Sequence, residues 1–396
     1  MKHCPATAGR PRFDIADIVR RHRAEVEVDG HLSLAQRRVL SAIALCRTAA
    51  LGGHLDVCRS CGFERPSYNS CRNRHCPKCQ ALAQEKWIAA RSAQILPARH
   101  FHVVFTLPAE LRSLAKYRPR EVFSALFAVV SQALLELAES RLGVLPGITM
   151  VLHTWTRDLR FHPHVHTIVS AGGLTSDAVW RASSTKYLFP VQIMGALLRG
   201  KMMHALHELH AGGVFNGADL LRDPQGFDRM MGRLARIDWI TYAKRPFRKI
   251  DHVLKYLGRY THRVAIANSR LIDVTAASVG FRTKDGKIAT MAPKEFLRRF
   301  VQHVLPDGFH KIRHAGLYAG AHVADGTLDA ARRQLAGDDA RPPDSRSPPE
   351  PSWEDRLLAL TGRDVHQCPR CHARLEYVPL PAAPRAARDP PRLLCA

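Results

Sequence analysis

The alternation of apolar and polar residues divides the chain into three zones, and the first contains helices on either side of a cysteine-rich stretch. Two helical patterns open it. The second begins at Ser33, a typical N-cap with Gln36 three residues later, and is predicted to end at Gly52-Gly53. A third helical run covers residues 81–96. We therefore assign residues 1–97 to an N-terminal domain.

The middle zone, residues 98–322, alternates between strand and helix patterns. FHVVFTL (101–107) predicts one strand, and residues 148–155 and 164–171 predict two more that are close enough to form a hairpin. Further patterns predict helices at 121–141, 191–210 and 250–260, and short strands at 264–282 and 287–291. Strands interleaved with crossing helices predict an α+β fold rather than an all-helical protein.

The third zone, residues 323–396, is predicted to be a linker and a C-terminal tail. Residues 338–352 are rich in Pro, Asp and Arg, and a short helix is expected at 353–360. The final stretch has the composition of a disordered segment. A lone CxxC at Cys368 and Cys371 supplies only half of a metal site, so its role stays open.

The balance of charge points to a polyanionic partner. The chain carries 59 Lys and Arg against 35 Asp and Glu, a formal net charge of +24. The most apolar window, 122–137, is interrupted by polar residues and is too short for a membrane span, and the N-terminus lacks a signal-peptide pattern. We therefore expect DNA as the partner, with no membrane and no small-molecule substrate, and a cytoplasmic, nucleoid-associated protein.

Two CxxC pairs predict a structural Zn²⁺ site in the N-terminal domain. Cys58-x2-Cys61 and Cys76-x2-Cys79 are separated by 14 residues, a spacing at which two turns can present four thiolates to one tetrahedral ion. In a reducing compartment cysteines are metal ligands more often than disulfides. Spare donors close by in the sequence are Cys71, His75 and His54.

Basic residues around the second pair are candidates for DNA contact. Arg72, Arg74 and Lys78 lie on the predicted metal-stapled loop, with Arg65 and Tyr68 before them. Cations beside an aromatic ring suit phosphate contact and base stacking. Solvated arginines around a purely structural zinc explain the pattern equally well.

A histidine pair on a predicted strand is a candidate catalytic metal site. Side chains alternate along a strand, so His164 and His166 share one face while Val165 points to the other. Two imidazoles can hold a divalent ion that polarises a phosphoryl oxygen. A third ligand must come from elsewhere, and His102 is a candidate if its strand lies beside this one.

Two tyrosines on a predicted helix are candidate nucleophiles. Tyr256 and Tyr260 are spaced i,i+4 and so share one face. Three cations at the same spacing are candidate DNA-binding residues: Lys255, Arg259 and Arg263. A nearby cation and a metal on the attacked phosphate would make a tyrosine attack feasible. Half-buried packing is the competing interpretation of the same spacing.

Four segments together resemble one family. CRNRHCPKC, HFHVVFTLP, HPHVH and YLGRYTHR occur in the order and spacing of the rolling-circle insertion-sequence transposases, the group named after insertion sequence ninety-one. The resemblance extends over residues 13–320. It implies an HUH nuclease domain with a central antiparallel sheet of ferredoxin/RRM-like type. It also implies that His164 and His166 hold a catalytic Mg²⁺ or Mn²⁺, and that Tyr256 and Tyr260 form 5′-phosphotyrosine links.

The expected function is therefore transposition through metal-dependent cleavage and transfer of single-stranded DNA. A replication initiator or a relaxase would use the same chemistry, and element ends flanking the gene would distinguish these enzymes from a transposase. A catalytically inactive, zinc-dependent DNA-binding remnant is the alternative from another class. A carboxylate-triad transposase lacks a matching acidic cluster, and a tyrosine recombinase of the integrase kind would not need the HVH strand.

Overall fold

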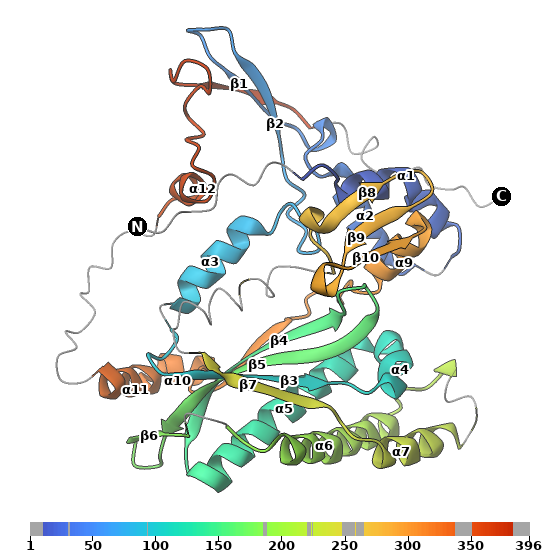
Figure 1. Cartoon of the computed structure of the whole chain (residues 1–396), viewed down its shortest axis with the longest axis vertical. Coiled ribbons are helices and arrows are strands. Elements are labelled where there is room, and N and C mark those ends of the chain that lie inside the picture. Colours follow the sequence, from blue (N-terminus) through green and yellow to red (C-terminus); the bar gives the residue numbers. More distant parts are fainter. Residues whose placement is uncertain are drawn as a thin grey trace.

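The computed structural model describes residues 11–30, 32–92, 94–184, 188–219, 223, 225–247, 258, 265–336 and 351–382. A central antiparallel sheet separates a layer of helices on one face from a single helix and the N-terminal domain on the other (Figure 1). This mixed architecture confirms the predicted α+β fold class with an antiparallel central sheet and an N-terminal zinc-binding domain.

The central sheet has the strand order β11-β4-β5-β3-β7, and β6 pairs with the end of β5. Its strands are β3 (His100–Thr106), β4 (Leu145–Trp155), β5 (Phe161–Leu174), β6 (Trp180–Ala182), β7 (Thr241–Phe247) and β11 (Ile312–Gly316). The predicted hairpin is confirmed as β4 and β5, which pair antiparallel. The succession β3-α5-β4-β5-α6-β7, with β3 and β5 central, is that of a ferredoxin-like unit.

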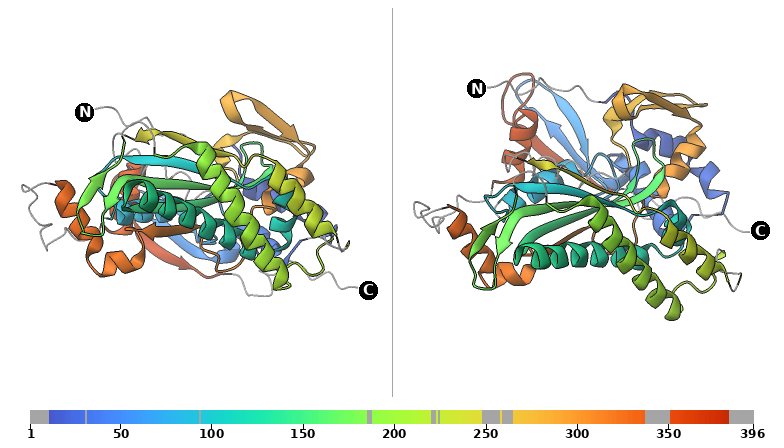
Figure 2. Two further views of the ribbon diagram at one scale, coloured as in Figure 1. Left: turned by 90° about the horizontal axis from the view of Figure 1, so that it is seen from below. Right: turned by 60° about the horizontal axis from the view of Figure 1, so that its bottom comes forward.

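One face of this sheet is apolar and covered by helices. Strand alternation directs Phe101, Val103 and Phe105 of β3 into this layer. The helices are α4 (Arg112–Tyr117), α5 (Pro119–Leu142), α6 (Val191–Ala211) and α7 (Gly226–Arg236), preceded by the short η2 (Ala109–Leu111). Figure 2 shows α5 and α6 lying across the sheet. Helix α5 is long and apolar enough to cross a membrane, but more than half of that window is buried, as in a core helix.

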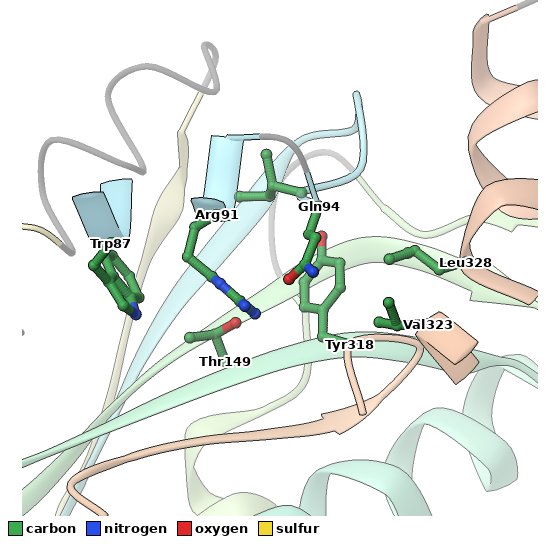
Figure 3. Close-up of a pocket in the computed structure, with 8 residues that line it drawn as sticks. Trp87, Arg91, Gln94, Thr149, Tyr318, Val323 and Leu328 are labelled. Atoms are coloured by element: carbon green, nitrogen blue, oxygen red, sulfur yellow. The ribbon is translucent and has the colours of Figure 1, made fainter. Parts of the chain in front are cut away.

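The opposite face carries histidines and is partly covered by α3 (Ala81–Ser92). Trp87 of this helix packs against Val151 and Ile168. Arg91 Nη1 donates to His314 Nε2 (3.2 Å), and His314 Nδ1 donates in turn to the Thr149 hydroxyl (3.0 Å; Figure 3 shows Arg91 and Thr149). Burial lowers the pKa of His314 to about 4, so its ring is neutral and can accept from the guanidinium. An apolar contact and a polar chain thus hold α3 on this face.

The N-terminal helices share a core with later segments of the chain. These elements are α1 (Ile15–Glu27), α2 (Leu34–Leu45), β8 (Leu271–Val274), β9 (Val279–Arg282), β10 (Ile288–Met291) and α9 (Pro293–Val301). The short η4 (Asn268–Arg270) precedes β8, and η5 (Lys284–Gly286) joins β9 to β10. The predicted capping box of Ser33 and Gln36 is confirmed. The predicted end of that helix is wrong, because Cys46 adopts an extended backbone and η1 (Ala49–Leu51) follows.

A small sheet joins the two ends of the described chain. Its strands are β1 (Gly53–Val57), β2 (Glu64–Tyr68) and β12 (Glu376–Leu380), in the order β12-β1-β2. Three helices precede β12: α10 (Gly320–Ala324), α11 (Thr327–Ala336) and α12 (Trp353–Thr361). Residues 351–382, expected to be a helix followed by a tail, therefore also supply a strand to the sheet of the first zone, whereas residues 383–396 lie outside the described part.

Two histidines at the ends of secondary-structure elements are fully buried: His100 at the start of β3, and His303 just after α9. His100 Nδ1 donates to the Ala98 carbonyl, and its Nε2 accepts from the Tyr318 hydroxyl (2.7 Å). His303 Nε2 donates to the Leu159 carbonyl. Burial lowers the pKa of His100 to about 4 and that of His303 to about 3. Both rings are therefore neutral in the folded protein at pH values where an unfolded histidine is already protonated.

We expect the free energy of unfolding to fall as the pH drops below about 6.5, the pKa of an unfolded histidine. The unfolded chain binds protons first, so this stability is complete above pH 6.5 and is lost toward pH 4. The loss per histidine is about 1.4 kcal/mol for each pH unit. Urea unfolding at pH 7, 6, 5 and 4.5 measures this decline in the free energy of unfolding. His100→Gln should flatten the pH dependence; an equally steep decline in this variant would contradict the explanation.

Candidate functional site

Three imidazoles converge on the face of the sheet opposite the main helical layer. Strands β4 and β5 pair so that His153 lies opposite His164, and His166 follows on the same side of β5. One ring nitrogen from each of the three lies within 4.8 Å of the other two. Apolar residues on the alternate positions, such as Val165, anchor the strand in the core. The geometry is that of three ligands arranged around one ion.

The Nδ1 contact of His164 leaves a lone pair on its Nε2, and the Nε2 of His166 lies beside it. His164 Nδ1 donates to the His162 carbonyl (2.7 Å), so the Nε2 of a neutral His164 carries a lone pair. Burial lowers the pKa of His164 to about 4 and holds that of His166 well below its usual value. Their Nε2 atoms are 3.1 Å apart, close to the separation of about 3.0 Å for two nitrogens bound at right angles to one ion. A divalent cation fits this site.

His102 contacts the His166 ring from the neighbouring strand. Strand β3 lies beside β5, as the sequence interpretation required, but His102 Nε2 is 2.9 Å from His166 Nδ1 and stacks with that ring. When His166 binds through Nε2, its Nδ1–H donates to His102. The three grouped imidazoles favour His153 over His102 as the candidate third ligand, since the register of the hairpin brings β4 to the pair.

The tyrosine segment is described only at Gly258. Tyr256 and Tyr260 lie outside the described residues, as do Lys255, Arg259 and Arg263. Gly258 is buried against α3, and a Cβ on it would lie 2.4 Å from Ile88 Cδ1. Because α3 covers part of the histidine face, a residue between the two tyrosines contacts a helix that adjoins the site.

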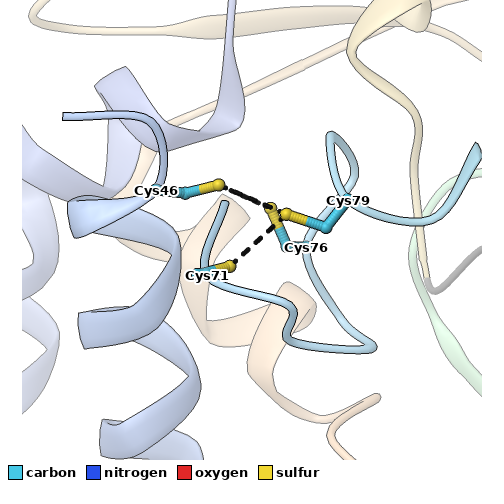
Figure 4. Close-up of side chains that lie close together, drawn as sticks. All are labelled: Cys46, Cys71, Cys76 and Cys79. Atoms are coloured by element: carbon cyan, nitrogen blue, oxygen red, sulfur yellow. Dashed lines mark hydrogen bonds between the residues drawn. The ribbon is translucent and has the colours of Figure 1, made fainter. Parts of the chain in front are cut away.

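Four cysteines of the N-terminal domain form one cluster (Figure 4). Cys46 ends α2, and the other members, Cys71, Cys76 and Cys79, lie on the loop before α3. Cys79 Sγ is 3.3 Å from Cys46 Sγ and 3.6 Å from Cys71 Sγ. A tetrahedral zinc with bonds of about 2.3 Å separates its sulfurs by about 3.8 Å. Hydrogen bonds from Cys46 and Cys71 lower the pKa of Cys79, which suits a thiolate ligand.

The expected grouping of Cys58, Cys61, Cys76 and Cys79 around one ion is therefore wrong. Cys76 and Cys79 join Cys46 and Cys71, whereas Cys58 and Cys61 lie with the C-terminal CxxC. The reason is that strands β1 and β2 carry the first CxxC turn away from the second. Two of the spare donors are engaged elsewhere, because His75 Nε2 accepts from Leu305 N (3.2 Å) and His54 pairs with Asp56 (3.0 Å).

The candidate DNA-binding cations of this loop differ in exposure. Arg74 is half-buried and donates to the carbonyls of Pro306 and Phe309, so it anchors the loop to the chain itself. Lys78 forms an ion pair with Asp14 (2.7 Å). Arg72 is exposed, and its left-handed backbone (φ 53°) turns the chain at this point. Arg72 is thus the member of the three that presents its charge to solvent.

Comparison with known proteins gives a consistent result. The family model described as "Putative transposase" matches residues 147–325, and that described as "Transposase zinc-binding domain" matches residues 18–107. The putative transposase y4qJ of Sinorhizobium fredii is 40% identical over 91% of this chain and 93% of its own length. The transposase for insertion sequence element IS801 of Pseudomonas savastanoi pv. phaseolicola is 28% identical over 88% and 85%. No solved structure matches.

The sheet with converging histidines and the cysteine cluster lie within the two matched regions, and the comparisons define the class of the protein. The chain belongs to the IS91 family of rolling-circle insertion-sequence transposases. Its partner is therefore DNA. Of the enzymes considered from the sequence, the comparisons identify a transposase rather than a replication initiator or a relaxase. The cysteine cluster and the zinc-binding domain support a structural Zn²⁺.

Proposed function

We propose that this transposase cleaves single-stranded DNA with Tyr256 or Tyr260, at a metal site formed by His153, His164 and His166. The convergence of three imidazole nitrogens within 4.8 Å carries the proposal. The Nδ1 hydrogen bond of His164 and the lowered pKa values of His164 and His166 suit cation binding. A cluster of histidines with lowered pKa values, on the face that α3 and Gly258 adjoin, has the composition of a reaction centre.

The proposed reaction conserves the phosphodiester bond energy. The phenolic oxygen of one tyrosine attacks phosphorus, the bond from phosphorus to the 3′ oxygen breaks, and the leaving oxygen takes up a proton. The 5′ phosphate stays on the tyrosine. A 3′ hydroxyl of another strand later attacks that phosphotyrosine and releases the phenol. With two tyrosines, two such transfers can follow each other.

The histidine set fits a catalytic divalent ion. Bound to His153, His164 and His166, the ion would supply positive charge that polarises a phosphoryl oxygen. An all-imidazole set favours Mn²⁺ over Mg²⁺, because Mg²⁺ prefers oxygen ligands. His102 would keep the His166 ring oriented through the 2.9 Å contact. We also propose that Arg72, Lys255, Arg259 and Arg263 contact DNA phosphates, and that Arg74 and Lys78 support the loop instead.

The formation of a covalent adduct tests the proposal. End-labelled single strands carrying the end sequence of the element are incubated with Mn²⁺ and wild type, Tyr256→Phe, Tyr260→Phe or the double variant. We expect a DNA–protein adduct on denaturing gels with wild type and none with the double variant, because no phenolic nucleophile remains. Tyr117→Phe is the matched control, since its hydroxyl donates to the Asn216 carbonyl away from the histidines.

The outcomes separate the competing interpretations. Equal adduct from wild type and the double variant would refute tyrosine attack at these positions. Absence of adduct from every protein, together with tight binding of the same oligonucleotide, would favour the inactive DNA-binding remnant. The single variants show which tyrosine attacks first. The variant that still forms the adduct retains the first nucleophile, because only its second transfer fails.

A further inference from the structure

The two CxxC motifs that lie farthest apart in the sequence lie together in space. Cys58 and Cys61 form the turn between β1 and β2, and Cys368 and Cys371 form a turn shortly before β12. Cys58 Sγ is 3.4 Å from Cys371 Sγ, and Cys61 Sγ is 3.6 Å from Cys368 Sγ. All four sulfurs lie within 4.8 Å of one another. These separations approach the edge of about 3.8 Å expected for a tetrahedral Zn–Cys4 site.

The two turns have the same backbone structure. Cys58 N donates to the Phe63 carbonyl, and Gly62 N donates back to the Cys58 carbonyl. Cys368 N donates to the Ala373 carbonyl, and His372 N donates back to the Cys368 carbonyl. Gly62 and His372 both have a left-handed backbone, with φ of 69° and 61°. One local conformation thus presents a pair of thiols at each of two distant CxxC motifs.

The surroundings are built around the four sulfurs. The first cysteine of each turn, Cys58 and Cys368, is fully buried and packs with Leu375. Arg370 N points at Cys368 Sγ (3.4 Å), the kind of donor that stabilises a thiolate. Strand β12 pairs with β1 from Gly53↔Leu380 to Val57↔Glu376, so the backbone pairing extends to the residue before Cys58. Cys61 and Cys371 are exposed, so the burial of one thiol from each turn, together with the paired strands, distinguishes the set from thiols gathered by chance at a surface.

We propose that Cys58, Cys61, Cys368 and Cys371 bind a second structural Zn²⁺, which fastens the C-terminal segment to the N-terminal domain. The matched zinc-binding domain ends at residue 107, so it contains only half of these ligands. The ion completes a zinc ribbon whose two halves are separated by more than 300 residues of the chain. This site is independent of the cluster at Cys46, Cys71, Cys76 and Cys79 and of the proposed cleavage chemistry.

Zinc content of the purified full-length protein tests the proposal. Besides any zinc held by the three histidines, we expect two zinc ions per chain in wild type and one in Cys368→Ser/Cys371→Ser. Cys58→Ser/Cys61→Ser should lose the same ion, so a quadruple variant should still retain one. Cys71→Ser/Cys79→Ser is the matched control, which loses the other ion. A single ion in wild type, or unchanged zinc in Cys368→Ser/Cys371→Ser, would overturn the proposal.

Two further measurements distinguish the loss of a zinc ligand from misfolding of the serine variants. Cys371→His preserves a metal ligand and should retain two ions where Cys371→Ser retains one; loss of the ion from both would count against coordination at this position. Alkylation without reductant, followed by intact mass, shows whether the four thiols are free after zinc is removed. Disulfides between them in freshly purified protein would replace the zinc site and refute it.

Discussion

His153→Ala is expected to lower Mn²⁺-dependent cleavage of single-stranded DNA by roughly 100-fold or more. The alanine removes one of three imidazoles from a buried site, and the two that remain hold an ion weakly. Its position opposite His164 in the β4–β5 ladder means that the backbone pairing survives the change. Mn²⁺ titration with calorimetry should show the weaker binding, and single-turnover cleavage at saturating DNA should show the lost rate.

Two neighbouring histidines provide controls. His162→Ala alters the same strand, but its Nδ1 faces Arg112 (3.3 Å), so cleavage should stay close to wild type. His102→Ala removes the partner of His166 and should weaken Mn²⁺ binding about tenfold, with cleavage restored at high Mn²⁺. If His102→Ala proved more damaging than His153→Ala and was not rescued, His102 would be the third ligand after all.

Gly258→Val is expected to lower cleavage by about 10- to 100-fold without changing Mn²⁺ affinity. A Cβ at this position would lie 2.4 Å from Ile88 Cδ1 and 2.8 Å from Ile88 Cγ1, and valine adds two further methyl groups. Either the Ile88 side chain or the backbone at Gly258 must then shift; we expect the backbone to shift, and a misplacement of about 1 Å of a reacting group can cost about 100-fold in rate. Adduct formation and Mn²⁺ titration of the same preparation separate the two effects.

The compensating variant makes this prediction specific. Ile88→Ala removes the atoms that the valine would meet, so Gly258→Val/Ile88→Ala should recover most of the lost cleavage. Gly200→Val is the matched control, because Gly200 lies within α6 and a Cβ on it would meet no side chain of the described residues within 4 Å. Equal damage from Gly258→Val in the presence and absence of Ile88→Ala would show that contact with α3 does not position the segment.

Local signals in the sequence were sufficient for much of the fold. Ser33 and Gln36 marked the start of α2, and apolar alternation located β3, β4 and β5. These features depend on residues a few positions apart. The end of α2 was misjudged, because Cys46 leaves the helix to join a metal cluster whose other members are distant in the sequence.

The parts of the site that sequence reasoning missed depend on register and long-range pairing. The sequence places His153 on the first strand of the predicted hairpin. The register of the β4–β5 pairing shifts between His153 and Trp155, so the number of residues in the hairpin does not predict that His153 lies opposite His164. The CxxC pairs were grouped by proximity, whereas β12 brings the C-terminal pair to Cys58 and Cys61. Arg74 was interpreted as a free cation because its acceptors lie more than 200 residues away.

The pairing of β12 with β1 sets an order for the synthesis of the protein. Strand β1 is complete at Val57, but its neighbour is translated only when the ribosome reaches Glu376–Leu380. At about 5–20 residues per second, β1 waits roughly 15 to 60 seconds with one edge unpaired. A nascent chain that terminates before residue 376 can form the histidine-bearing sheet and yet leave this edge of β1 open, so such a fragment would expose an unpaired strand edge to other chains.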